Sequence, residues 1–237
     1  MRTLFVTGTD TGVGKTYVSC LLLKALSQAG VRALPFKPVA AGAEQGADGH
    51  WYNEDGQALQ QACAEPLPYT LINPVTLPDP LSPHLAAARV GRTVTTAELL
   101  DAVEAFHPWQ PQLLLVEGAG GWRVPLNEHE TLADLAKALL ADRRAGGVVL
   151  VVGMRLGCLN HALLTAEAIR ADGLPLLGWV ANCIDPEMNA LADNIATLEA
   201  RLGAPRLATL AYGATAADFD LRPLLGAAII SPEIGKP

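Results

Sequence analysis

Between a short apolar run and a longer amphipathic stretch, the chain carries GTDTGVGKT at residues 8–16. The run Leu4–Thr7 predicts a strand, and Thr16–Ala29 has the apolar spacing of a helix that Gly30 would end. Glycines between a strand and a helix let backbone N–H groups converge, and the helix N-terminus adds roughly half a positive charge. The segment therefore predicts a loop that binds the phosphates of ATP or GTP, although five residues separate Gly8 from Gly14, one more than in the usual pattern. Lys15 would reach the β- and γ-phosphates, and the Thr16 hydroxyl would ligate Mg²⁺.

The same alternation of apolar runs and amphipathic stretches returns along the rest of the chain. The runs are nearly continuous in apolar residues, which is typical of strands buried on both faces of a parallel sheet. We expect an α/β fold of the P-loop NTPase type, a mostly parallel sheet with helices on both faces, in a single domain over 1–237. The further strands are predicted at Val31–Lys37, Leu113–Val116, Val148–Val152, Leu176–Ala181 and Leu207–Leu210, and the helices at Leu132–Leu140, Leu159–Arg170 and Glu187–Leu202.

Three segments interrupt this alternation. Ala40–Asn53 is rich in glycine and polar residues and is predicted to be a loop. Pro66–Pro83 contains six prolines, which exclude a regular central element. Ser231–Pro237 is expected to be frayed.

Composition narrows the classes of partner. The 237 residues carry 17 basic and 24 acidic side chains, a net charge of −7, which argues against nucleic acid or an anionic membrane surface as a partner. Apolar runs such as Gly147–Gly153 are too short to cross a bilayer, and the N-terminus lacks a secretory pattern, so a cytoplasmic location is expected. The four cysteines are scattered in apolar sequence and are predicted to be buried, reduced thiols: Cys20, Cys63, Cys158 and Cys183.

Two further charged residues lie at predicted strand ends. Glu117 follows the apolar run Leu113–Val116 and precedes a predicted glycine-rich turn, where an acid could hold the metal of a nucleotide. Lys37 ends the second predicted strand and is followed by Pro38. It either converges with Lys15 beside the phosphate loop or is a solvated loop residue.

Together these segments resemble the dethiobiotin synthetase family. The similarity covers FVTGTDTGVGKT (5–16), FKPVAAG (36–42), Ser82-Pro83-His84, VEGAGGW (116–122), RLGCLNHALLT (155–165) and GWVAN (178–182). GKT alone is shared with many ATPases. The combination with GTDT, the KPVA lysine and VEGAGG is far more specific, and the motifs occur in the family's order over residues 4 to 212.

The resemblance implies an ATP- and Mg²⁺-dependent ligase, with 7,8-diaminononanoate, CO₂ and ATP as substrates. The products would be dethiobiotin, ADP and phosphate, formed through a carbamate and a carbamic-phosphoric anhydride. It also implies a homodimer in which the substrate carboxylate reaches a turn of the partner subunit, here Gly157, Cys158, Leu159 and Asn160. Free amides at a helix N-terminus suit a carboxylate.

The resemblance also assigns roles by position. Lys37, Lys15 and Thr11 would be catalytic, and Thr16, Asp55 and Glu117 would ligate Mg²⁺, with Glu54 as an adjacent alternative to Asp55. The substrate would contact Thr11, Lys37, Ala41, Gly118 and the turn at 157–160. The nucleotide would contact Gly12, Val13, Gly14, Lys15, Thr16, Tyr17, Asp55, Glu117, Gly118, Ala119, Gly120, Asn182, Cys183, Leu210, Ala211 and Tyr212.

Two departures and two alternatives remain. The family commonly has serine where Ala41 stands, and often proline where Ala211 stands. A cobalamin-pathway amidoligase would need a glutaminase domain, for which the chain has no room. A partitioning-type ATPase would carry a second lysine early in the phosphate loop, and residues 8–14 contain none.

Overall fold

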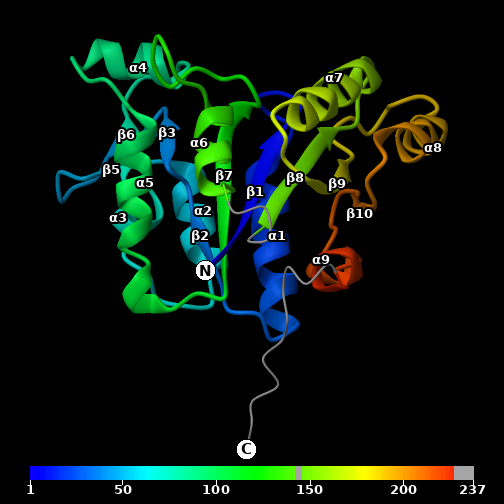
Figure 1. The fold of residues 1–237 in the computed structure, drawn as a ribbon, viewed down its shortest axis with the longest axis horizontal. Helices are drawn as coiled ribbons and strands as arrows, with labels where there is room; N and C mark the ends of the chain where they lie inside the picture. Colours follow the sequence, from blue (N-terminus) through cyan, green and yellow to red (C-terminus); the bar gives the residue numbers. More distant parts are fainter. Residues whose placement is uncertain (142–145, 227–237) are drawn as a thin grey trace, which may run out of the picture.

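The computed structural model describes residues 1–141 and 146–226. Its central sheet has six strands in the order β10-β9-β8-β1-β7-β2, and every neighbouring pair is parallel. The strands are β1 (Arg2–Gly8), β2 (Ala33–Phe36), β7 (Leu113–Gly121), β8 (Gly146–Gly153), β9 (Leu176–Asn182) and β10 (Arg206–Leu210). The predicted α/β fold with a mostly parallel sheet is confirmed (Figure 1).

Helices cover both faces of this sheet. Successive side chains of a strand point to opposite faces, so an apolar strand is buried only if both faces are covered. Leu150 and Val152 of β8 belong to the apolar cluster that includes α7 and α8, whereas Val149 and Val151 belong to the cluster that includes α1. The helices are α1 (Lys15–Gln28), α2 (Glu54–Ala62), α3 (Tyr69–Ile72), α4 (Pro83–Arg89), α5 (Thr96–Glu104), α6 (Leu132–Leu139), α7 (Cys158–Ala171), α8 (Leu191–Leu202) and α9 (Arg222–Gly226), with short 3₁₀ turns at His107–Trp109 and Ala216–Asp218.

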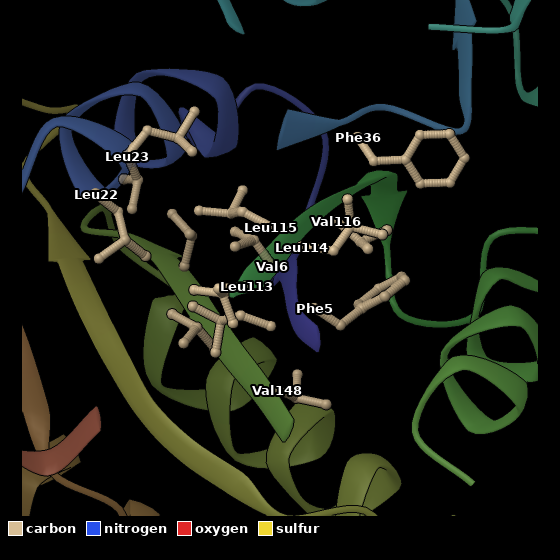
Figure 2. Packing of buried hydrophobic residues seen from close by; sticks show 14 of the residues in the cluster. Phe5, Val6, Leu22, Leu23, Phe36, Leu113, Leu114, Leu115, Val116 and Val148 are labelled. Atoms are coloured by element: carbon tan, nitrogen blue, oxygen red, sulfur yellow. The ribbon is translucent and has the colours of Figure 1, made fainter. Parts of the chain in front are cut away.

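Helix α1 directly follows the phosphate loop and is anchored in the core. Its leucines pack into the main core together with β7, as Figure 2 shows for Leu22 and the labelled residues of Leu113–Val116. Gly30 ends it as predicted: φ is +77°, its N–H donates to the Ser27 carbonyl, and the Val31 N–H donates to that of Leu26. This is the Schellman arrangement, which satisfies the last carbonyls of a helix.

The prediction of a loop at Ala40–Asn53 was wrong in part, whereas Pro66–Pro83 contributes no strand to the central sheet, as predicted. Within 40–53 the structure has the end of β3 (Val39–Ala41) and a hairpin of β4 (Glu44–Gln45) and β5 (Trp51–Tyr52). Within 66–83 it has α3 and β6 (Val75–Leu77), and β6 pairs with β3 in a separate two-stranded sheet. The prolines are tolerated because they fall between elements or at a helix start, as Pro83 does at α4.

Other boundaries also needed correction. The predicted turn after Glu117 is wrong, because β7 continues to Gly121, where it pairs with Gly8 of β1 across a register shift. The last long helix begins at Leu191 rather than Glu187. Only Cys158 among the four free cysteines is buried; the other three are half-buried. The segment Ser231–Pro237 lies outside the described residues.

Among residues 1–141 and 146–226, no helix combines the length and the apolar character that a membrane span requires.

Candidate active site

The phosphate loop lies between β1 and α1, at the carboxyl edge of the sheet. Gly12 and Gly14 have φ of +73° and +81°, the left-handed region that favours glycine. No side chain caps the N-terminus of α1, and no acidic residue lies in its first turn. The N–H groups there are thus available to an anion, with the helix dipole behind them.

Lys15 begins α1 and is buried in the same loop. Its Nζ donates to the carbonyl of Asp10 at 3.2 Å. Burial, together with the charge of Lys37, lowers the pKa of Lys15 to about 8. The Lys15 ammonium is therefore poorly hydrated, and a bound anionic ligand would stabilise its charged form.

Lys37 meets two carboxylates although 80 residues separate it from one of them. Its Nζ donates to Glu117 Oε1 at 2.6 Å, to Asp55 Oδ2 at 3.0 Å and to the carbonyl of Gly118 at 3.3 Å. Lys37 is 2% exposed. The interpretation of Lys37 as a solvated loop residue is therefore wrong, and its convergence on the phosphate loop is confirmed.

Burial and charge act in opposite directions at this cluster. Burial lowers the pKa of Lys37, but the carboxylates of Glu117 and Asp55 outweigh it, and the net shift is upward. For Asp55, burial raises the pKa, but the Lys37 ammonium outweighs it, and the net shift is downward. Lys37 and Asp55 are thus held as an ion pair at neutral pH.

Three oxygen donors converge where the sequence predicts a magnesium site. The Thr16 hydroxyl donates to Glu117 Oε1 at 2.7 Å, and Asp55 reaches the same cluster through Lys37. The second carboxylate oxygen of Glu117 is buried and has no hydrogen-bond partner among the described residues. A hydroxyl and two carboxylates are hard ligands of the kind that Mg²⁺ takes together with water and phosphate oxygens, so the donor set fits this ion. No cluster of three His, Cys, Asp or Glu side chains with metal-binding geometry occurs in the described part of the chain.

A cavity of about 680 Å³ opens over these groups. Its polar lining comes from the phosphate loop, Lys37 and Asp55, and its apolar lining comes mainly from residues 80–85 and Val124. Its lining residues are Thr11, Gly12, Gly14, Lys15, Thr16, Lys37, Ala40, Ala41, Asp55, Pro80, Leu81, Ser82, Pro83, Leu85, Ala119, Gly120 and Val124. The cavity suits a ligand that is anionic at one end and aliphatic along its length.

Some residues that the resemblance assigns to the nucleotide lie on the other side of the phosphate loop from Lys37: Asn182, Cys183, Leu210, Ala211 and Tyr212. Strands β9 and β10 are separated from β1 by β8, whereas β7 and β2, which carry Glu117 and precede Lys37, lie on the opposite side. The buried Asn182, at the end of β9, donates from its side-chain amide to the Val13 carbonyl at 2.8 Å. Nearby, the Cys183 N–H donates to the Leu210 carbonyl, and the Tyr17 hydroxyl to that of Ala214. Ala211 and Tyr212 are exposed.

The predicted substrate turn is set apart from the cavity. Among the described residues, the cavity lining includes none of Gly157, Cys158, Leu159 and Asn160. Cys158, the first residue of α7, packs into the core. Gly157, at the N-cap of this helix, has φ of +95°. A nearby ion pair that the sequence did not reveal joins this turn to the phosphate loop: Arg155 Nη2 lies 2.6 Å from Asp10 Oδ2.

The sequence analysis did not predict the apolar lining residues Pro80, Leu81, Leu85 and Val124. The motif Ser82-Pro83-His84 lies within this segment and was the available signal. It carried no information about which side chains face the cavity. Glu54, the alternative to Asp55, is exposed and lies outside the cavity lining that the structure describes.

Known proteins resemble this chain in sequence and in fold. The sequence model of a family described as AAA domain matches residues 2–216. A relative from Alteromonas mediterranea, an ATP-dependent dethiobiotin synthetase BioD, is 49% identical over 222 residues, or 90% of this chain and 93% of that protein. Proteins of the same name from Pseudomonas aeruginosa (49% over 230 residues; 94% and 98%) and Xanthomonas axonopodis pv. citri (50% over 202 residues; 85% and 87%) are also similar.

Solved structures of low sequence identity share the fold. FtsY from Physcomitrella patens chloroplasts superposes with a TM-score of 0.54 at 20% identity, covering 97% of this chain and 65% of that one. FtsY from Elizabethkingia anophelis in complex with GDP gives 0.55 at 13% identity, covering 96% and 63%. The chain thus spans about two thirds of the length of these structures, and at such identities the likeness concerns the fold alone.

Proposed function

The chain belongs to the family of ATP-dependent dethiobiotin synthetases, and from this membership we propose that it closes the ureido ring of dethiobiotin as one catalytic domain. The substrates would be 7,8-diaminononanoate, CO₂ and ATP, and the products dethiobiotin, ADP and phosphate. One observation carries the proposal: two buried lysines and two carboxylates meet beside a phosphate loop, at a cavity that also has apolar lining residues.

The first step requires a neutral amine. An alkyl ammonium titrates near ~10, so one amine of the substrate must lose a proton before its nitrogen attacks the carbon of CO₂. The Lys15 and Lys37 ammonium groups next to the cavity favour the neutral amine and then stabilise the carbamate anion. No dedicated general base is needed for this step beyond solvent.

The second step joins two anions. A carbamate oxygen attacks the γ-phosphorus of ATP, the bond from that phosphorus to the β,γ-bridging oxygen breaks, and ADP leaves. Lys15, Lys37 and the N–H groups of the loop would orient both reactants and offset their repulsion. Thr16, Asp55 and Glu117 would hold Mg²⁺, which supplies charge neutralisation on the phosphates when bound.

The third step closes the ring. The second amine attacks the carbonyl carbon of the carbamic-phosphoric anhydride, its proton is lost, and phosphate departs with the C–O bonding pair. The apolar side chains of Pro80, Leu81, Leu85 and Val124 give the aliphatic part of the substrate a place away from water. The backbone and small side chain of Ala41, also in the lining, would contact it without the hydroxyl that serine provides.

An assay of ATP hydrolysis tests the whole proposal. With both diaminononanoate and bicarbonate present, we expect release of ADP and formation of one dethiobiotin per ADP. Omitting either substrate should lower ADP release by at least about tenfold, because the acceptor of the phosphoryl group is then absent. Hydrolysis that does not depend on the two substrates would contradict the proposal and favour a nucleotide-driven switch.

We further propose that the active site is shared between two copies of the chain. The turn at 157–160 does not line the cavity of the same chain, although α7 begins there without a side-chain cap, and such a helix N-terminus suits a carboxylate. Leu156 and Leu164, which flank and belong to α7, are 98% and 56% exposed, the kind of apolar surface that an interface covers.

Mixing two inactive variants tests the sharing. Lys37→Gln removes the lysine from one site, and Asn160→Asp places a negative charge where the carboxylate of the substrate would bind. A mixed dimer has one site with both lesions and one intact site, so a random mixture should regain about a quarter of wild-type activity. Absence of rescue, with mixed dimers demonstrated by mass spectrometry, would place each site within one chain.

A further inference from the structure

Behind Lys37, polar groups form a closed ring of hydrogen bonds that begins and ends at this residue. The Asn73 side-chain amide donates to the Lys37 carbonyl at 2.8 Å, and the Tyr69 hydroxyl donates to Asn73 Oδ1 at 3.0 Å. The Asn53 N–H donates to the Tyr69 hydroxyl at 2.7 Å, and the Asp55 N–H donates to Asn53 Oδ1 at 3.0 Å. Lys37 Nζ closes the ring on Asp55 Oδ2 at 3.0 Å.

Four of the five members of the ring are buried, and only the side chain of Asp55, 46% exposed, reaches solvent. Lys37, Asn53, Tyr69 and Asn73 are each at most 9% exposed. Inside a protein, a polar network in which each member has its partner is costly to distort, because any broken bond leaves a buried group unpaired. The ring therefore fixes the path between the backbone of Lys37 and the start of α2, which carries Asp55.

Two more contacts tie the ring to the site. The Lys37 N–H donates to the Ile72 carbonyl at 2.7 Å, so both backbone polar groups of Lys37 are held by the end of α3 and the residue after it. On the other side, the Asn53 amide donates to the Ala41 carbonyl at 3.1 Å, and Ala41 lines the cavity. The ring thus joins the lysine, its carboxylate partner and the cavity wall.

Gly56 provides an independent sign that this packing is required. A Cβ at position 56 would lie 2.9 Å from both the Tyr69 hydroxyl and Asn73 Oδ1. Gly56 is buried within α2, where glycine is unfavourable relative to alanine. The sequence thus carries a poor helix former at a position where a methyl group would crowd the Tyr69 hydroxyl and Asn73.

We propose that Tyr69 and Asn73 are positioning residues for the reaction that closes the ureido ring. They hold Lys37 and Asp55 at the separation that this reaction needs. The inference rests on the proposed function of the same site. Neither residue lines the cavity that the structure describes, so both would act through Lys37 and Asp55. Catalytic groups must be held to within about half an ångström, and a displacement near 1 Å can cost about a hundredfold in rate.

Tyr69→Phe tests the ring with the loss of one hydroxyl. We expect kcat to fall at least about tenfold while KM for ATP stays within about twofold, because the Tyr69 hydroxyl itself bonds to Asn53 and Asn73 and not to the phosphate loop. Tyr52→Phe is a matched control. The centroids of the Tyr52 and Tyr69 aromatic rings lie 4.8 Å apart, but the Tyr52 hydroxyl donates to Asp48 on the exposed hairpin. That variant should keep kcat within about twofold of wild type.

Gly56→Ala extends the test without removing a polar atom. It should lower kcat like Tyr69→Phe, and the double variant should be no slower than the worse single one, because both changes open the same ring. Rates are expressed per folded molecule, with the folded fraction measured by circular dichroism. A loss of activity that matches the loss of folded protein, full additivity of the two changes, or an equal loss in Tyr52→Phe would overturn the proposal.

A second readout does not depend on turnover. The ¹⁵N-detected ammonium signal of Lys37, assigned with Lys37→Gln, should shift or broaden in Tyr69→Phe and stay unchanged in Tyr52→Phe at constant pH. If the wild-type enzyme does not convert diaminononanoate, the proposed function fails, and this signal still tests the ring. An unchanged signal in Tyr69→Phe, or failure of both Tyr69→Phe and Gly56→Ala to fold, would reduce the ring to a structural role.

Discussion

Replacing Lys37 by glutamine should abolish ring closure, with kcat reduced by about a thousandfold or more, while ATP binding changes less than about threefold. The reason is local: Lys37 Nζ lies between Glu117 and Asp55, whereas the loop amides and Lys15 are left in place. Steady-state rates and calorimetric titration with a non-hydrolysable ATP analogue measure the two effects separately.

The same substitution should also lower stability. It leaves the carboxylate of Glu117, which is 0% exposed, without its cation, and breaking a buried ion pair from one side costs about 3–5 kcal/mol. Rates must therefore be corrected for the folded fraction, measured by denaturant unfolding. Lys24→Gln, an exposed lysine on α1, is the control and should behave like wild type. Turnover within about tenfold of wild type in folded Lys37→Gln would remove the proposed role of this residue.

Lys15→Ala should weaken ATP binding by about a hundredfold and lower turnover by at least as much, since the side chain is a desolvated cation at the phosphate loop. The pH dependence identifies the group. The pKa of Lys15 is lowered from 10.5 to about 8, so the cation is present at pH 7 and is lost from the nucleotide-free enzyme as pH rises through 8. Wild-type ATP affinity should then fall by up to about tenfold per pH unit above 8, with uptake of a proton on binding.

Calorimetry at pH 7, 8 and 9 (a range set by the shifted pKa of about 8) in buffers of different ionisation enthalpy measures both effects. Lys15→Ala should show weak binding with little of this pH dependence, and Lys24→Ala should match wild type. Normal titration curves for Lys15→Ala would contradict the assignment of the phosphate loop. A wild-type affinity that is flat from pH 7 to 9 would contradict the lowered pKa of Lys15.

Elements with a strong local signal were predicted well, and those held only by tertiary contacts were not. The strand at β8 and the helix at α1 differ from prediction by a residue or two, because continuous apolar runs and helical spacing are read directly from neighbouring residues. Helix α2 was missed because its sequence, EDGQALQQA, has an internal glycine and only two buried residues. Strand β6 lies in the proline-rich segment and exists through its pairing with β3.

By itself the sequence determined the α/β fold, the phosphate loop, the importance of the acid Glu117 and the family to which the chain belongs. These follow from residues that are close along the chain, whose spacing fixes local conformation and buried face. Only the tertiary structure decided that Asp55 rather than Glu54 meets Lys37, that Lys37 is buried against Glu117, and that Tyr69 and Asn73 stand behind it. The physical reason is that these side chains are 18 to 80 residues apart, and their separation is set by packing of the sheet against α2 and α3 rather than by any local pattern.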